Sequence, residues 1–188
     1  MPCRLPALAA AFGAALLLAG CVQPPPQAPM RLEPTYESAA RAPLLHSSRE
    51  AIARLLSGLD TTVTGPGPVL VATVVNINDL GMSAPLGRTL SEQYANAMAM
   101  AGFDVKEIKL RGEVFVKEGA GELLLSREIR DIARHHSASM VLVGTFSPAA
   151  SYTYVSLKLV RTEDSRIIRG HDYALPNDRD ITRLLVPR

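Results

Sequence analysis

Val69-Leu70-Val71-Ala72-Thr73-Val74-Val75, residues 69–75, is the stretch of sequence that decides the fold. It is an almost unbroken apolar run rich in β-branched side chains, a composition typical of a strand buried on both faces. The segment 61–68 before it is rich in Gly and Pro and separates the strand from the preceding element. We therefore expect a central strand with helices packed on it.

A helix is predicted on each side of this strand. The first occupies 47–58, with Ser47 and Ser48 as capping residues and a one-sided apolar stripe. That stripe consists of Ile52, Leu55, Leu56 and Leu59. The second helix opens at Ser83 and Pro85 and is closed by Gly102. Its core-facing residues recur every four positions and are Leu86, Leu90, Tyr94 and Met98.

The second half of the chain alternates short apolar runs with turn residues and ends in a hairpin. We expect strands at 103–110, 114–116, 123–125, 140–146, 151–160 and 166–174, and helices at 126–136 and 178–185. Strands that alternate with helices and end in a hairpin predict an α/β fold, a mixed β-sheet flanked by helices. The predicted domain is single and spans 47–188.

The N-terminus is typical of an export signal. Arg4 precedes an apolar run from Leu5 to Leu18, which is too short for a permanent membrane helix. The run ends in Leu18-Ala19-Gly20-Cys21, which resembles the lipobox of bacterial lipoproteins. This resemblance implies a signal peptide at 1–20 and lipidation of Cys21. The alternative is an ordinary secretory signal in which the cysteine is accidental.

The residues after Cys21 bear on two points, the membrane in which the lipid anchor would lie and the segment that joins it to the domain. The lipoprotein resemblance favours the outer membrane, because Val22 stands where an Asp commonly signals retention in the inner membrane. Residues 21–46 are rich in proline and lack apolar periodicity, so we expect the lipid-anchored Cys followed by an extended linker. A proline-rich docking site is the alternative to a plain spacer. The domain would then face the periplasm.

Composition argues against several classes of function. Charged residues make up 20% of the chain and the formal net charge is +2, without a basic block that would favour nucleic-acid binding. The only cysteines are Cys3 and Cys21, so the folded part has no thiol for a disulfide or a zinc site. We expect no cofactor and no small-molecule substrate.

Candidate polar residues give no convincing catalytic or metal site. His135 and His136 are adjacent at a predicted helix end and point about 100° apart, so a structural role near the helix dipole is favoured over metal binding. His171 has Asp172 beside it but no partner nucleophile. The loop 76–83 precedes a helix N-terminus and would suit an anion, but it lacks a phosphate-binding glycine pattern, and a structural role is favoured.

Two tyrosines are the candidate partner contacts. Tyr152 and Tyr154 alternate with apolar residues, so both lie on the polar face of the predicted strand 151–160, together with Ser156 and Lys158. Tyrosine is enriched at protein interfaces, which makes this pair a possible docking patch. The alternative is that both rings pack across the strand against 166–174.

From residue 69 onward the order of motifs resembles the FlgO family of flagella-associated lipoproteins. The pieces that carry the resemblance are Asn78-Asp79-Leu80, Pro85-Leu86-Gly87-Arg88, Ser91-Glu92-Gln93, Gly102-Phe103-Asp104-Val105, Val116-Lys117-Glu118-Gly119-Ala120-Gly121-Glu122, Leu125-Ser126-Arg127, Ile132-Ala133 and Val141-Leu142-Val143-Gly144-Thr145. Together they cover 69–178, and their order and spacing are more specific than any one of them.

The resemblance implies an outer-membrane lipoprotein that is not an enzyme. It would support flagellar assembly or motility through contacts with flagellar basal-body proteins or other envelope proteins. An accessory protein of envelope assembly or secretion, with an α/β module similar to the curli-secretion type, is the alternative. An anion-binding hydrolase at the loop 76–83 is a third hypothesis, and the sequence offers no nucleophile with a base to support it.

Overall fold

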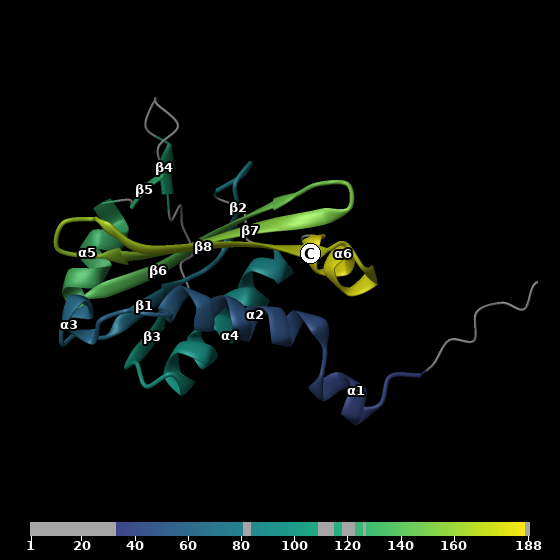
Figure 1. Cartoon of the computed structure of the whole chain (residues 1–188). Helices are drawn as coiled ribbons and strands as arrows, with labels where there is room; N and C mark the ends of the chain where they lie inside the picture. The colour runs from purple at the N-terminus through teal and green to yellow at the C-terminus, as the bar shows by residue number, and fades with distance from the viewer. Residues whose placement is uncertain (1–32, 81–83, 109–114, 118–122, 126, 187–188) are drawn as a thin grey trace, which may run out of the picture. The chain divides into compact units, whose positions relative to one another are not determined.

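The computed structural model describes residues 33–80, 84–108, 115–117, 123–125 and 127–186 (Figure 1). The chain divides into two compact units, Met1–Thr35 and Tyr36–Arg188. Only residues 33–35 of the first unit are described, and they form neither helix nor strand. The signal peptide, Cys21 and most of the expected linker therefore lie outside the described residues.

The second unit combines helices and strands throughout its length, in an α/β order. The helices are α1 (Tyr36–Ala40), α2 (Pro43–Leu56), α3 (Thr61–Thr64), α4 (Pro85–Met100), α5 (Arg127–His135) and α6 (Arg179–Leu185). The strands are β1 (Val69–Ala72), β2 (Val75–Asn76), β3 (Val105–Ile108), β4 (Phe115–Lys117), β5 (Leu123–Leu125), β6 (Met140–Pro148), β7 (Tyr152–Arg161) and β8 (Ile167–Pro176).

The described strands form one mixed sheet and a separate hairpin. The sheet has the order β3-β1-β6-β7-β8, and β2 pairs with β6 beyond the end of β1. Strand β1 is parallel to both β3 and β6, whereas β7 is antiparallel to its two neighbours, β6 and β8. Strands β4 and β5 form an antiparallel pair of their own. The predicted mixed α/β sheet flanked by helices is confirmed.

Helices α2 and α4 cover one face of this sheet (Figure 1). The four residues of the predicted α4 stripe are all fully buried: Leu86, Leu90, Tyr94 and Met98. From α2 the buried residues of the predicted stripe are Ile52 and Leu55. They meet β7 and β8 side chains such as Leu157 and Leu175, and these contacts form the larger of two hydrophobic clusters. The helical periodicity of the sequence therefore identifies the main core correctly.

The predicted start of the first helix at Ser47 is wrong. Helix α2 begins at Pro43, where the missing N–H removes no intrahelical hydrogen bond. Ser48 lies one turn inside the helix, is buried, and donates from its hydroxyl to the Leu44 carbonyl at 2.9 Å. The helix therefore starts within the segment that was expected to be linker, and the compact unit begins earlier still, at Tyr36.

The apolar run 69–75 is split into β1 and β2 by an interaction with α4. The Val74 N–H donates to Ser91 Oγ at 2.9 Å instead of pairing with a strand. At the same point α4 comes so near that a Cβ on Gly87 would lie 1.9 Å from the Val74 carbonyl oxygen. All four residues of β1 are buried, which confirms the prediction of a central buried strand.

Helix α4 ends where the sequence predicts, through a glycine in the left-handed region. Gly102 has φ of 92° and its N–H donates to the Ala99 carbonyl. The Phe103 N–H reaches back to the Met98 carbonyl at 3.2 Å, which completes a Schellman motif. The chain then turns directly into β3, so this motif positions the edge of the sheet next to β1.

The second face of the sheet is covered over only part of its width. Ala133 of α5 packs on Leu70, Val141 and Val143, and with their neighbours they form the second hydrophobic cluster. Figure 1 shows α5 on the side of the sheet away from α2 and α4. On the β7–β8 part of this face, Val160 near the end of β7 is the one described residue that this cluster includes. That part carries the candidate partner contacts.

Candidate functional site

The open part of the second sheet face is built from side chains that alternate along β6, β7 and β8. Tyr152 and Tyr154 of β7 are 49% and 56% exposed, whereas Thr153 between them and Val155 after them are buried. The alternation follows from the pleat of a strand, which sends successive side chains to opposite faces. Both tyrosines therefore lie on the polar face, as the sequence predicts.

The register of the three strands aligns polar and apolar side chains in rows across this face. Thr145 of β6 is paired with Ser156 of β7, which is paired with Asp172 of β8. The next row contains Ser147, Tyr154 and Ala174, which are paired in the same way. We call the surface formed by these two rows, together with Tyr152 and Ile77, the open face. On β8, Tyr152 is paired with Pro176 and Tyr154 with Ala174. The cross-strand neighbours of the two rings are therefore a cyclic and a small side chain.

A hollow of about 570 Å³ lies on the open face. Its apolar lining includes Ile77 and Tyr154, and Ile77 is itself 45% exposed. Ile77 follows β2 and donates its N–H to the Phe146 carbonyl at 3.0 Å, which holds it beside β6. The polar lining consists of Thr145, Ser147, Ser156 and Asp172. Their side chains form no hydrogen bond or ion pair with another described residue.

Sequence reasoning found the tyrosines but missed most of this hollow. Thr145 and Ser147 lie on β6, Asp172 lies on β8 and Ile77 follows β2. Only the pairing of these strands brings the four residues together. The single signal in the sequence was the alternation that placed Ser156 on the same face as Tyr154. Asp172 was considered only as a neighbour of His171, whose side chain lies on the opposite face of β8 beside Tyr173.

On the helix-covered face, the buried Tyr94 and the partly buried Tyr173 tie α4 to the edge strand. The hydroxyls of Tyr94 and Tyr173 hydrogen-bond to each other. Burial raises the pKa of Tyr173 to about 12, although hydrogen bonds with Tyr94 and Ser48 act in the opposite direction. The pKa of Tyr94 is also raised well above its usual value, mainly by burial and then by the neighbouring Tyr173. Both phenols therefore stay protonated near neutral pH and have a structural role.

The predicted histidines are dispersed. His135 and His136 lie at and just after the end of α5, and His171 is stacked on Tyr173 with ring centroids 6.1 Å apart. His46 lies 3.8 Å from Glu50, whose pKa is lowered by its hydrogen bond and ion pair with Arg54. Across the part of the chain that the structure describes, no group of three or more His, Cys, Asp or Glu residues is placed to hold a metal ion.

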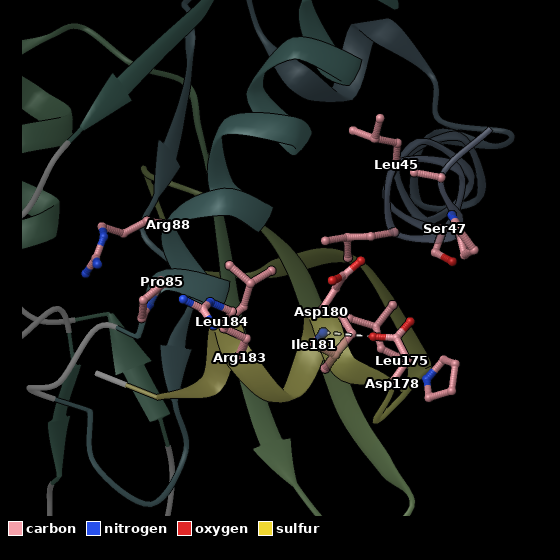
Figure 2. Close-up of a pocket in the computed structure, with 14 residues that line it drawn as sticks. Leu45, Ser47, Pro85, Arg88, Leu175, Asp178, Asp180, Ile181, Arg183 and Leu184 are labelled. Carbon is pink, nitrogen blue, oxygen red and sulfur yellow. Dashed lines mark hydrogen bonds between the residues drawn. The ribbon is translucent and has the colours of Figure 1, made fainter. Parts of the chain in front are cut away.

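A second concave feature, a groove of about 600 Å³, lies between the first turns of α2 and α4 and helix α6 (Figure 2). Its lining is mostly apolar and includes Leu44, Leu175, Ile181 and Leu184. Figure 2 shows Arg88 and Arg183 toward one side and Asp178 and Asp180 toward the other. Asp178 is the N-cap of α6, since its carboxylate accepts from the Ile181 N–H at 2.8 Å.

The loop 76–83 was the candidate anion site, and its described part is occupied by local turns. The Asn76 side chain accepts from the Asn78 N–H at 3.0 Å, and the Asn76 carbonyl accepts from the Asp79 N–H. Residues 81–83 lie outside the described part of the chain. The N–H groups of Asn78 and Asp79 are thus satisfied within the loop, and that of Ile77 by β6.

The fold assigns the protein to a structural class. It is a mixed α/β domain whose sheet is covered by helices on one face and partly open on the other. Within that class, the chain belongs to the FlgO protein family, because a model of this family matches residues 49–180, more than half of the chain. The resemblance predicted from 69–178 is confirmed. The match also includes most of α2. No curated protein matches the chain.

Solved structures with a similar fold come from other bacterial proteins. The C-terminal domain of LpoB from Escherichia coli is 18% identical, with a TM-score of 0.49, over 71% of this chain and 98% of that one. Lipoprotein GNA1162 from Neisseria meningitidis is 18% identical, with a TM-score of 0.40, over 61% and 84% of the two chains. At these identities the similarity concerns the fold and not the activity.

The family match supports the broader class that the N-terminal sequence predicts, an envelope lipoprotein. Within the described residues, no helix is both long and apolar enough to cross a membrane.

Proposed function

We propose that this chain is a non-enzymatic outer-membrane lipoprotein that supports flagellar assembly or motility by binding another envelope protein. Membership in the FlgO family is the observation that carries this proposal. Lipidation of Cys21 would hold the domain at the membrane, since a mature lipoprotein carries more than one acyl chain and each buried CH₂ contributes about 0.8 kcal/mol. The domain would face the periplasm.

The open face is the surface that we assign to the partner. Tyr152 and Tyr154 present two large rings that make no aromatic contact with another described residue, and exposed tyrosines of this kind are enriched in the buried centres of protein interfaces. The rings are held on a long strand that is paired on both sides, so little conformational entropy is lost when a partner binds. A rigid, partly apolar platform suits contact with protein better than catalysis.

The test is complementation of a deletion strain in a soft-agar swimming assay. Deletion should impair swimming and the wild-type gene should restore it. Cys21→Ser should fail to restore it and should lose labelling by radioactive palmitate, because an untethered domain loses its high local concentration near the partner. The double change Tyr152→Ser and Tyr154→Ser should also fail, while remaining folded and lipidated.

Two matched controls make the outcome specific. Tyr36→Ser removes a tyrosine that is 99% exposed but lies on α1, away from the open face, and should restore swimming fully. The variant with His135, His136 and His171 all changed to Gln should also restore swimming, because we assign these residues no catalytic or metal role. Normal swimming of the deletion strain, with a defect in export of a surface polymer, would favour the envelope assembly or secretion alternative. Equal palmitate labelling of Cys21→Ser would refute the lipid anchor.

A further inference from the structure

The hollow on the open face contains one acidic group, and that group is unpaired. The Asp172 side chain is exposed on the edge strand β8, and it forms no ion pair or hydrogen bond with another described residue. Lys158 is the nearest cation by register on this face, but it is paired with Gly170, one row away from Asp172, and no ion pair joins the two. The hollow therefore has a negative charge available to a partner.

We propose that this hollow receives an arginine side chain of the partner protein, with the guanidinium paired to Asp172 and stacked on Tyr154. The inference rests on the proposed function, since it specifies the chemistry of the surface that the open face binds. It commits the open face to a partner segment that carries a positive charge next to apolar residues.

The oxygen atoms around the hollow match the donors of a guanidinium. Thr145, Ser156 and Asp172 lie in one row on three adjacent strands, which are about 4.8 Å apart. A guanidinium has five N–H donors in a fixed plane, so it can bond a carboxylate with two of them and still reach a neighbouring hydroxyl. A lysine ammonium presents its three donors at one point and would satisfy fewer of these separated acceptors.

The apolar lining matches the rest of an arginine side chain. The Tyr154 ring is more than half exposed, and a cation over an aromatic face contributes about 0.5–1 kcal/mol at an exposed site. Ile77 and Ala174 line the same hollow and would contact the methylene groups of the arginine stem. The volume of about 570 Å³ accommodates this side chain together with parts of its neighbours.

The inference can be tested with a small probe and the full-length chain. The ¹⁵N-labelled lipoprotein in detergent micelles would be titrated with N-acetyl-arginine methylamide, and binding followed by amide chemical shifts. The amides of Tyr154, Ser156 and Asp172 should shift saturably. The citrulline analogue, which has the same shape but no charge, should bind about tenfold more weakly, a difference of about 1.4 kcal/mol.

Substitutions then locate the site. Asp172→Asn and Tyr154→Leu should each weaken binding of the arginine probe several-fold, while the melting curve of each variant shows that it is folded. Asp180→Asn, which removes a carboxylate at the groove beside α6, should leave binding unchanged. Equal binding of the citrulline analogue, unchanged binding by Asp172→Asn, or shifts confined to the groove would each overturn the proposal.

Two further outcomes separate this inference from the proposed function. A saccharide such as N-acetylglucosamine that shifts the same amides, when the arginine probe does not, would identify the hollow as a glycan site and refute an arginine partner. Probe binding is measured without any flagellar component, so normal swimming of the deletion strain would refute the flagellar role and leave the binding result standing. Absence of probe binding with impaired swimming would refute only the arginine contact.

Discussion

At Gly87, helix α4 approaches the link between β1 and β2 so closely that no side chain fits. A Cβ there would lie 1.9 Å from the Val74 carbonyl oxygen, and that carbonyl belongs to backbone that cannot easily shift. Ser91, one turn later on the same helix, accepts the Val74 N–H and donates to the Gly87 carbonyl at 2.7 Å. The helix and the strand are thus joined by direct backbone packing and one hydroxyl.

We predict that Gly87→Ala destabilises the protein by about 3 kcal/mol, the upper range for overpacking a core. In an ordinary helix the same change would stabilise by about 1 kcal/mol, so the sign of the effect tests the packing. Urea unfolding would measure it. Gly170→Ala is the matched control, because its nearest neighbour would be the Leu157 carbonyl oxygen at 3.6 Å, an ordinary contact. Equal stability of Gly87→Ala and the wild type would contradict the close approach.

The buried phenols predict a pH dependence of stability. An unfolded tyrosine has a pKa of 10.0, whereas burial raises the folded pKa of Tyr173 to about 12 and that of Tyr94 well above its usual value. A raised folded pKa means that the unfolded state releases its proton first. The stability that the pair contributes should therefore be fully present below pH 10 and decline as the pH rises from 10 toward 12.

Urea unfolding of the wild type and of Tyr173→Phe between about pH 8 and about pH 11.5 would measure this effect. The difference in unfolding free energy between the two should be constant below pH 10 and should change above it, as the phenols of the unfolded wild-type chain ionise. Tyr36→Phe, which changes an exposed ring, should reproduce the wild-type profile. Parallel profiles of Tyr173→Phe and the wild type up to pH 11.5 would argue against burial of the pair.

At the scale of elements, the N-terminal boundary of the folded unit depends on the first turn of α2. Leu44 in this turn packs against the main core, and its carbonyl accepts the hydroxyl of the buried Ser48. Helix α1, by contrast, buries none of its residues. The residues between Pro43 and Ser47 therefore belong to the domain in energetic terms, whereas α1 contributes little.

We predict that a chain that begins at Ser47 is about 2 kcal/mol less stable than one that begins at Tyr36, because it loses the apolar contacts of Leu44. Urea unfolding of the two chains would give the difference. A chain that begins at Ala42 keeps the whole of α2 and should match the one that begins at Tyr36. If the chains from Ser47 and Tyr36 unfold at the same urea concentration, the first turn of α2 contributes nothing.

The hairpin of β7 and β8 is the element that places the candidate site. Its strands are ten residues long, and their register holds from the pair Tyr152 and Pro176 as far as an irregularity between Leu159 and Val160. Because side chains alternate with a period of two, a slip of one residue would move Asp172 to the helix-covered face. The turn 162–165 and the pairing of β6 with β7 therefore determine which residues share the hollow.

At the scale of the whole molecule, unequal coverage of the two sheet faces produces the binding surface. Helices α2, α4 and α6 contribute to the main cluster on one face, whereas on the other face α5 contributes to a smaller cluster that reaches β7 only at Val160. The antiparallel strands β7 and β8 tolerate an exposed polar face, as such strands commonly do. The parallel strand β1 is buried on both faces.

The sequence by itself determined the features that depend on neighbours along the chain. These are the apolar run of β1, the apolar stripe on α4, the end of α4 at Gly102, and the alternation that exposes Tyr152 and Tyr154. Each follows from helical or strand periodicity or from the backbone freedom of glycine, which act over a few residues. The family resemblance rests on the order of such local motifs, and it too was accessible from the sequence.

Only the tertiary structure decided the strand order β3-β1-β6-β7-β8 and the register that unites Ile77, Thr145, Ser156 and Asp172. Ile77 is far along the chain from the other three residues, and the predicted hairpin of β7 and β8 does not specify that β1, β2 and β7 all pair with β6. The start of α2 was also decided by packing, since Leu44 gains burial that outweighs the capping preference of Ser47. Pairing and burial are long-range interactions, and for that reason the hollow was not visible in the sequence.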